Sequence, residues 1–319
     1  MKRRKLHLAI FTVLAASAFS CTLEDNINTV KIELDPLYPE TELKGWELDE
    51  TNTGLKQDYS GLTGFDAEGA DASSGYLPEW GTLTLYAGAT VTDRTISNAL
   101  NLEAGGITLQ RCLIRPASVG MGMPLVVAGD AVLQDCEIDG SLIPDDNIVY
   151  SIAFSGTGII ERCDIHHAAT GIYLNNNSRR ISVAQGNYIH DLRWISPAHM
   201  DGMTIRGSSG TGLIMRNNRS ICGSSEGSTG ALFIQPYSSY IDNVLIKGNL
   251  LEGYGYTLSL EDRGYGYGEN MRAINNRFNP YPGSWGPAAV DGGPGWYEWT
   301  DNYRYDSSAE DCRGDEIAQ

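Results

Sequence analysis

The chain has 319 residues, with 23 Lys or Arg against 40 Asp or Glu, so its formal net charge is −17 at pH 7. A protein this acidic does not hold nucleic acid or an anionic membrane surface by general electrostatic attraction. The six cysteines follow neither the pattern of a small disulfide scaffold nor the spacing of a zinc site.

The N-terminus has the features of an export signal over residues 1–20. Basic residues at positions 2–5 precede an apolar stretch, residues 6–19, that is too short to span a membrane permanently. The stretch ends in Ala-Phe-Ser-Cys21, which resembles a bacterial lipobox, and this resemblance implies lipidation of Cys21. Ordinary cleavage after Ala18 is the alternative. Both predict an exported protein, either a cell-surface or periplasmic lipoprotein or a secreted one, whose only membrane contact would be a lipid at Cys21.

Two segments separate this signal from the first repeated strands. Residues 21–45 are polar and acidic and contain Pro36 and Pro39, which predicts a flexible tether. Residues 46–77 are rich in Gly, Asp and Ser and predict an irregular cap, because the end coil of a solenoid exposes unpaired strand edges. At the other end, residues 306–319 are acidic and predict a C-terminal cap and loose tail.

A short phrase recurs along the chain: an apolar residue, two or so variable residues, Cys or Asn, one variable residue, and an apolar or aromatic residue. Its copies run from Cys112 to Asn302 with an average interval of about 27 residues, a period typical of solenoids. The copies are rich in strand-forming residues and flanked by turn residues, which indicates a parallel β-helix. The Cys or Asn position is held by Cys112, Cys136, Cys163, Asn187, Asn218, Asn249, Asn276 and Asn302.

Stacked coils place equivalent residues in columns about 4.8 Å apart. We therefore expect the asparagines to bond amide to amide along the axis, and the three cysteines of the same column to be buried thiols. A bridge between Cys222 and Cys312 stays open. The sequence predicts an all-β chain in which residues 46–305 form a single parallel β-helix of about eight or more coils with an N-terminal cap.

With these repeats, residues 83–305 resemble the right-handed parallel β-helix superfamily, the pectin-lyase-like group. Residues 201–206 and 241–252 are also similar to runs in uncharacterised secreted bacterial β-helix proteins. The resemblance implies a right-handed β-helix. It implies no single activity, because the superfamily holds lyases, hydrolases, esterases and phage spikes.

A second repeated strand lies between the copies of the phrase, and its alternating side chains predict two outward columns. The second column is polar in its last five members, as a site lining would be, although a solvated face would also be polar. The first column is predicted to hold Val126, Ala153, Tyr173, Thr204, Phe233, Ser259 and Ala289. The second is predicted to hold Ala128, Ser155, Asn175, Arg206, Gln235, Glu261 and Asp291.

Four of the five histidines fall between His166 and His199. His166 and His190 each come three positions after a Cys or Asn of the repeated column, so we expect them to stack on adjacent coils. Together with His167, and with His199 just before Asp201, they would bring imidazoles to one edge of the polar column, where this side chain can move protons near neutral pH. Turn histidines without a chemical role are the alternative.

The dipeptide Asp201-Gly202 resembles part of the Asn-Thr-Asp-Gly segment of the polygalacturonase branch, whose Asp is a catalytic carboxylic acid. His199 stands where that family has Asn, and the family's Asp-Asp, Gly-His-Gly and Arg-Ile-Lys segments are absent from the chain. The structural alternative is a turn in which Asp201 caps backbone amides.

These residues favour an extracellular polysaccharide lyase acting on an acidic glycan by β-elimination. A base removes the proton beside a uronate carboxylate, and a cation must first neutralise that carboxylate. Exposed tyrosines offer flat faces for sugar rings. The residues assigned to catalysis are His199, Asp201, Arg206, His190 and Tyr237. Those assigned to substrate binding are His166, Asn175, Gln235, Glu261, Arg263 and Tyr265.

In this scheme His199 is the base, Tyr237 or His190 is the acid, and Arg206 or a calcium ion held by Asp201 and Glu261 supplies the cation. Two other functions stay open. In a glycoside hydrolase of polygalacturonase type, Asp201 and Glu261 would be the two carboxylates, and their separation would set the stereochemistry. A surface lipoprotein that binds glycans, or mediates adhesion, would use the same groove without cleaving them.

Overall fold

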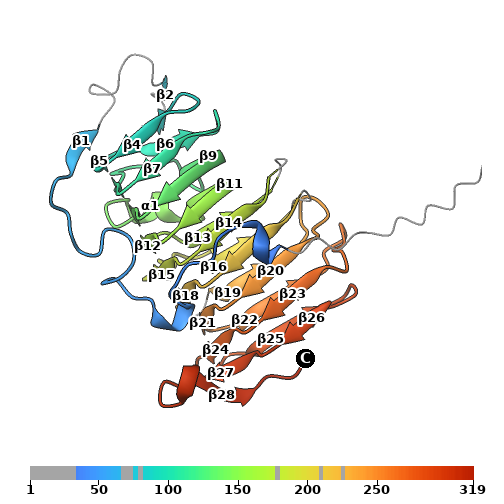
Figure 1. Cartoon of the computed structure of the whole chain (residues 1–319). Coiled ribbons are helices and arrows are strands. Elements are labelled where there is room, and N and C mark those ends of the chain that lie inside the picture. The colour runs from blue at the N-terminus through green and yellow to red at the C-terminus, as the bar shows by residue number, and fades with distance from the viewer. Residues whose placement is uncertain (1–33, 66–74, 78–81, 177–179, 208–210, 224–226) are drawn as a thin grey trace, which may run out of the picture. The chain divides into compact units, whose positions relative to one another are not determined.

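The computed structural model describes residues 34–65, 75–77, 82–176, 180–207, 211–223 and 227–319. The predicted signal, the lipidation site at Cys21 and the first part of the tether lie outside these residues. The chain is all-β and forms a parallel β-solenoid of about eight turns, which confirms the predicted fold class (Figure 1). No helix within the described ranges combines the length and apolar character needed to cross a membrane.

Each coil contributes one strand to each of three parallel sheets. Sheet one contains β3 (Thr82–Thr84), β6 (Ala99–Leu102), the first halves of β9 (Pro124–Gln134) and β11 (Ile152–Glu161), β13 (Thr170–Leu174), β16 (Met200–Ile205), β19 (Ser228–Ile234), β22 (Tyr256–Glu261) and β25 (Gly286–Asp291). Sheet two contains β4 (Thr90–Thr92), β7 (Thr108–Gln110), the second halves of β9 and β11, β14 (Ser182–Gln185), β17 (Leu213–Arg216), β20 (Val244–Lys247), β23 (Met271–Ile274) and β26 (Glu298–Thr300).

Sheet three follows the turn that contains the Cys or Asn column. It contains β1 (Thr63–Phe65), β5 (Arg94–Ile96), β8 (Leu113–Ile114), β10 (Glu137–Asp139), β12 (Asp164–His166), β15 (Tyr188–His190), β18 (Arg219–Cys222), β21 (Leu250–Gly253), β24 (Arg277–Pro280), β27 (Tyr303–Tyr305) and the antiparallel β28 (Arg313–Glu316). The remaining elements are β2 (Gly75–Leu77), α1 (Asp145–Ile148) and three short 3-10 helices, η1 (Asp35–Leu37), η2 (Gly45–Glu47) and η3 (Glu310–Cys312).

The asparagine column forms the predicted ladder. The side-chain amide of Asn187 donates to Asn218, that of Asn218 to Asn249, and so on to Asn302, with N···O distances of 2.9–3.0 Å. Each of these amide nitrogens also donates to a backbone carbonyl of the preceding coil, so the buried amides are satisfied along the column. Cys112, Cys136 and Cys163 continue the column as buried free thiols, and Cys222 and Cys312 are also unpaired.

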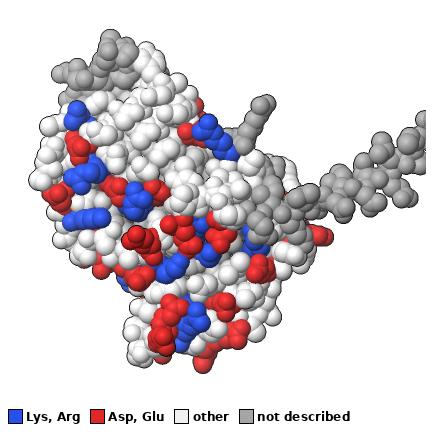
Figure 2. Space-filling model, in the orientation of Figure 1, with Lys and Arg blue, Asp and Glu red and all other residues white. Residues whose placement is uncertain are grey.

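A left-handed backbone residue precedes each ladder residue and makes the turn from sheet two to sheet three. The positions are Arg111, Asp135, Arg162, Gly186, Asn217, Gly248, Asn275 and Asp301, with φ between 51° and 67°. Two of these residues form salt bridges to the preceding coil: Arg111 to Asp93 and Arg162 to Asp135, each at 2.8 Å. In the orientation of Figure 1, Figure 2 shows acidic and basic side chains interspersed on the visible face of the molecule.

Residues 34–62, which we call the strap, lie across the outside of sheets two and three before β1 (Figure 1). Leu34 is fully buried against Val183, Ile214 and Leu245 on the outer face of sheet two. Arg216 is fully buried beneath the strap, where its guanidinium bonds to Asp35 at 3.0 Å and to the backbone carbonyl of Tyr38. The prediction of a flexible tether is therefore wrong for residues 34–45.

The sequence missed this packing because the strap is polar and contains prolines, as linkers do, while its partners lie far away in the chain: Tyr38 bonds to Glu161, 123 residues on, and Asp35 bonds to Lys247, 212 residues on. The predicted cap is also only partly right. Residues 46–62 belong to the strap, whereas β1 pairs with β5 and β2 pairs with β3 at the first coil. At the other end, β28 pairs with β27, and Asp311 bonds to the buried Arg277 at 3.0 Å. The C-terminal segment is thus an ordered cap rather than a loose tail.

The register of the first coils differs from the predicted outward columns. Val126 pairs with Phe154, and Val127 pairs with Ser155, which in turn pairs with Tyr173. Val126, Ala153 and Ala128 therefore do not belong to the outward columns, and Ser155 belongs to the first column instead of the second. The reason is that these strands are apolar at consecutive positions, so alternation alone does not fix their register. From Tyr173 onward the predicted first column is correct.

Candidate functional site

A line of polar side chains crosses the outer face of sheet one. It begins on β16, where a guanidinium nitrogen of Arg206 lies 3.4 Å from Asp201 Oδ2. Asp201 is 4% exposed, and its other carboxylate oxygen is buried without a hydrogen bond of normal geometry to any described residue. Burial raises the pKa of Asp201, and the positive charge of Arg206 opposes that shift. Asp201 is thus a buried carboxylate beside a half-exposed cation.

The line continues over the next two coils. Arg206 lies 3.5 Å from Gln235 Oε1, and Gln235 Nε2 lies 3.3 Å from Glu261 Oε2. Arg263 bonds to the same Glu261 oxygen through its Nε at 2.9 Å. The line therefore crosses β16, β19 and β22 and consists, in this order, of a carboxylate, a guanidinium, an amide, a second carboxylate and a second guanidinium. These five residues, all predicted from sequence, form one continuous polar line.

Aromatic rings lie under and beside this line. The guanidinium of Arg206 sits over the ring of Phe233, 5.2 Å from its centroid. Tyr237 lies three residues after the end of β19, and its backbone nitrogen donates to the carbonyl of Arg206 at 2.7 Å. Tyr237 and Tyr265 expose more than half of their surface. Flat aromatic surface beside hydrogen-bonding groups suits the binding of sugar rings.

The arrangement does not suit the calcium ion predicted between Asp201 and Glu261. The side chains of Arg206 and Gln235 lie between the two carboxylates. A calcium site needs several oxygen atoms around one point, at about 2.3–2.6 Å from the ion. The two carboxylates are therefore held apart by a cation and an amide, and they do not face a common point.

The histidines divide into two groups, which corrects the prediction of a single edge. His199 is exposed and comes directly before β16, close enough to Asp201 for a positive charge on the imidazole to lower the pKa of that carboxyl. His166 and His190 instead lie on the outer face of sheet three, in register on β12 and β15, with ring centroids 5.1 Å apart. Their predicted stacking is confirmed. The loop over residues 191–199 leads the chain from β15 of sheet three to β16 of sheet one, so the two groups belong to different sheets.

His190 and His166 belong to a network of carboxylates on sheet three. His190 bonds through its two ring nitrogens to Asp164 and Asp191, each at 2.8 Å. This pairing occupies the side chain that was assigned as a catalytic acid. Burial lowers the pKa of His190, but the hydrogen bond and the charge of Asp164 outweigh burial and raise it.

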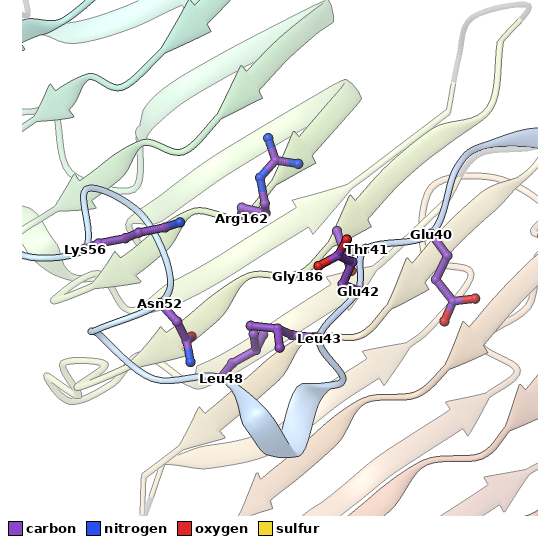
Figure 3. Close-up of a pocket in the computed structure, with 9 residues that line it drawn as sticks. All are labelled: Glu40, Thr41, Glu42, Leu43, Leu48, Asn52, Lys56, Arg162 and Gly186. Carbon is purple, nitrogen blue, oxygen red and sulfur yellow. The ribbon is translucent and has the colours of Figure 1, made fainter.

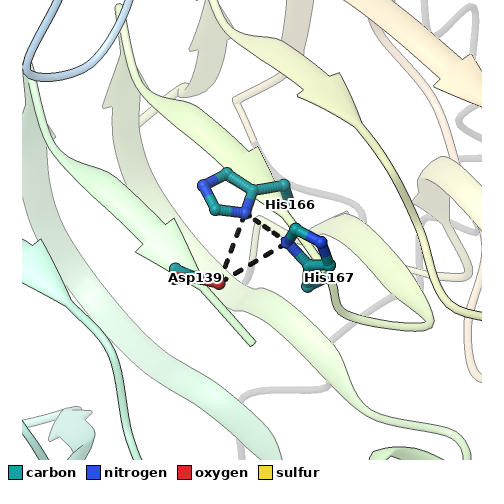
Figure 4. A group of neighbouring side chains, drawn as sticks. All are labelled: Asp139, His166 and His167. Carbon is teal, nitrogen blue, oxygen red and sulfur yellow. Dashed lines mark hydrogen bonds and ion pairs between the residues drawn. The ribbon is translucent and has the colours of Figure 1, made fainter. Parts of the chain in front are cut away.

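His166 is the centre of the tightest cluster in this network (Figure 4). Its Nδ1 atom lies 2.6 Å from His167 Nδ1 and 3.3 Å from Asp139 Oδ1, and His167 Nδ1 lies 3.5 Å from the same oxygen. Its Nε2 atom lies 3.4 Å from Glu137. Burial lowers the pKa of His166, but the bonds to Asp139 and Glu137 prevail and raise it to about 9.

The sequence analysis did not single out Asp139, although the repeat contains the signal that finds it. Asp139 follows Cys136 by three positions, as His166 follows Cys163 and His190 follows Asn187. The structure places the three side chains in one register column. Among the residues assigned to binding, His166 belongs to this cluster, whereas Asn175 follows β13 on sheet one.

A pocket of about 380 Å³ lies between the strap and the turn that contains the ladder residues, which we call the ladder corner (Figure 3). Two of its charged lining residues are already paired: Glu40 bonds to Lys44 and Asn217, and Arg162 bonds to Asp135 and Glu161. None of the residues assigned to catalysis or binding lines it. We therefore interpret the pocket as a gap in the packing of the strap.

Comparison with family models, with curated proteins and with solved structures finds no match for the chain. The parallel β-solenoid and its side-chain geometry are therefore the basis for any functional conclusion.

Proposed function

We propose that the protein is an exported, polysaccharide-active member of the pectin-lyase-like group, and that it cleaves an acidic glycan by β-elimination on the outer face of sheet one. The observation that carries the proposal is the position of Arg206. Its side chain is 31% exposed and touches Asp201 and Gln235 only at 3.4 and 3.5 Å. The guanidinium therefore keeps donors free for a carboxylate, which arginine binds in a bidentate manner.

We assign the steps of the reaction to Arg206, His199 and Tyr237. The guanidinium neutralises the uronate carboxylate, which makes the proton on the adjacent carbon more acidic. His199 takes that proton, the freed electron pair forms a carbon–carbon double bond, and the bond to the glycosidic oxygen breaks. The exposed Tyr237 gives a proton to the leaving oxygen. Water is not consumed, so the new non-reducing end carries an unsaturated sugar.

Ultraviolet absorbance of the unsaturated product tests this proposal directly. The wild-type protein is incubated with alginate, pectate, ulvan and glucuronan in separate reactions. We expect absorbance to rise with at least one polymer and to fall at least about a hundredfold in rate in His199→Ala, because a general base contributes about that much. New reducing ends without absorbance would instead show hydrolysis and contradict β-elimination.

Binding without cleavage is the second candidate, and one observation favours it. Arg206 and Arg263 each contact a carboxylate of the protein, Asp201 and Glu261, so the line is already neutralised in part. A surface of paired charges and exposed tyrosines can hold a glycan without activating it. Retention on a polysaccharide gel with no product after long incubation would favour this function over the lyase.

A further inference from the structure

We propose that Asp139, His166 and His167 bind a divalent transition-metal ion, best matched by zinc, on the outer face of sheet three. This site is separate from the polar line on sheet one and does not depend on the function proposed above. Two imidazole nitrogens and one carboxylate oxygen form the set of ligands (Figure 4). Such nitrogen and oxygen ligands suit zinc and its neighbours among the first-row metals.

The three ligand atoms have the separation that a metal ion requires. A circle through atoms that are 2.6, 3.3 and 3.5 Å apart has a radius of about 1.8 Å, which is shorter than the usual zinc–nitrogen bond of about 2.0–2.1 Å. A point slightly outside the plane of the three atoms is therefore at bonding distance from all of them. At that point the 3.3 and 3.5 Å separations subtend near-tetrahedral angles, whereas the 2.6 Å separation of the two Nδ1 atoms subtends about 80° and has to widen in a tetrahedral site.

A proton and a metal ion would use this triangle differently. A proton on His166 Nδ1 is shared between His167 Nδ1 at 2.6 Å and Asp139 Oδ1 at 3.3 Å, and it leaves the 3.5 Å separation of His167 Nδ1 and Asp139 Oδ1 without a hydrogen bond. A cation at the centre accepts a lone pair from all three atoms at once.

The backbone holds the two histidines on one side. Consecutive residues of a strand normally point to opposite faces. His167 follows the end of β12 and has a φ of 62°, a left-handed conformation that few non-glycine residues adopt. Its backbone nitrogen donates to the carbonyl of Asp191 at 3.2 Å, which ties this conformation to the next coil. The turn thus brings both Nδ1 atoms to Asp139.

Surrounding groups orient the ligands. Glu137 lies 3.4 Å from His166 Nε2, so His166 can donate there while its Nδ1 faces the metal, a pattern common in protein zinc sites. Arg115 and the hydroxyl of Ser141 bond to Asp139 Oδ2, while Oδ1 accepts the backbone N–H of Ser141 at 2.7 Å and also faces the two imidazoles. The side chains of Asp139 and Glu137 are 3% and 5% exposed, whereas that of His167 is 38% exposed.

This difference in exposure gives the site an open side. Three protein ligands with solvent at the fourth position are typical of zinc sites that bind or activate a small molecule, whereas structural zinc sites have four protein ligands. We therefore infer that the ion would keep one water ligand on the side of His167.

Titration of the full chain with Zn²⁺ or Co²⁺, after dialysis against a chelator and then its removal, tests the site. We expect one tightly bound ion per chain and, with Co²⁺, the visible absorption of a low-coordinate nitrogen and oxygen site. His167→Asn, which tolerates the left-handed backbone, is expected to lose at least about tenfold in affinity. Glu137→Gln is expected to weaken binding by about tenfold, as loss of a group that orients a ligand does.

The control is His199→Asn, which removes a histidine outside the cluster and should leave affinity and stoichiometry unchanged. Circular dichroism of each variant confirms that the coils remain folded. If the wild-type chain binds neither ion, or if His167→Asn binds both as tightly as the wild type does, the proposed metal site is wrong.

Discussion

The side-chain amide of Asn218 donates to the side-chain oxygen of Asn249 at 3.0 Å, and the same oxygen accepts the backbone N–H of Asn218 at 2.9 Å. Asn249 in turn donates to Asn276 and to the carbonyl of Met215. One fully buried side chain therefore makes four hydrogen bonds that span three coils. The ladder holds the coils in register in the way that a backbone sheet holds its strands.

Asn249→Ala tests this role. The substitution leaves several buried donors and acceptors without partners, each of which costs about 1–3 kcal/mol, so we expect a loss of at least about 3 kcal/mol in the free energy of unfolding. Chemical denaturation measures it. Asn101→Ala is the control, because the amide of Asn101 lies on the surface and bonds to Glu103 two residues away. A loss no larger than that of the control would contradict the role of the ladder.

Gly45 tests the contact between the strap and the coils. A Cβ atom added to Gly45 would lie 2.2 Å from the carbonyl oxygen of Asn218 and 2.4 Å from the nitrogen of Leu250. Both neighbours are backbone atoms of the ladder corner, so Gly45→Ala should displace the strap and destabilise the protein by about 2 kcal/mol or more. Limited proteolysis should then cleave within the strap.

Gly64→Ala is the matched control for this prediction. Its added Cβ atom would meet nothing within 4 Å, and its backbone is not in the left-handed region. We expect wild-type stability and wild-type resistance to protease. Equal stability and equal protease resistance of Gly45→Ala and Gly64→Ala would show that Gly45 is not in tight contact with the ladder corner.

The repeated features of the fold could be predicted from the sequence, whereas the features that occur once could not. The ladder and the stacking of His166 on His190 follow from a fixed period, which a single sequence displays. The strap does not repeat, and its main anchor, the fully buried Arg216, looks in the sequence like any charged residue of a strand. Its partner Asp35 is 181 residues away, and nothing in the sequence marks that pairing.

The candidate site was predicted unevenly for the same reason. Arg206, Gln235 and Glu261 share a column, so the period brought them together correctly. The prediction that His199 and His190 lie on one edge was wrong. The loop between them contains no copy of the repeat, so the sequence does not show which sheet follows it. The chain uses that loop to pass from sheet three to sheet one, so His190 on sheet three bonds to Asp164 and Asp191, whereas His199 comes directly before β16.

Acid should release the strap. Burial of Glu40 opposes its ionisation, but hydrogen bonds from Lys44 and Asn217 prevail and lower its pKa to about 2. Since the folded pKa lies below the unfolded one of about 4.5, the stabilisation is present above pH 4.5 and is lost as pH falls toward 2. Protease resistance of the strap, measured with an acid-stable protease, should fall over this window.

Glu40→Gln separates this effect from other carboxylates that titrate in the same range. The amide keeps the shape but removes the charge that pairs with Lys44 and Lys247. We expect the strap of this variant to be cleaved faster at neutral pH and to show a smaller further change on acidification. An unchanged acid dependence would assign the transition to other groups.

Affinity electrophoresis tests the central claim, that the cation at Arg206 on sheet one binds an acidic glycan. The wild-type protein, Arg206→Gln and Arg180→Ala are run in gels that contain alginate, pectate, ulvan or glucuronan, and in a gel without polymer. Arg180 is an exposed arginine away from the polar line, and its side chain is 78% exposed. We predict that at least one polymer retards the wild type and Arg180→Ala equally, while Arg206→Gln migrates as it does without polymer. Equal retardation of Arg206→Gln and the wild type, or no retardation of the wild type by any of the four polymers, would contradict the claim.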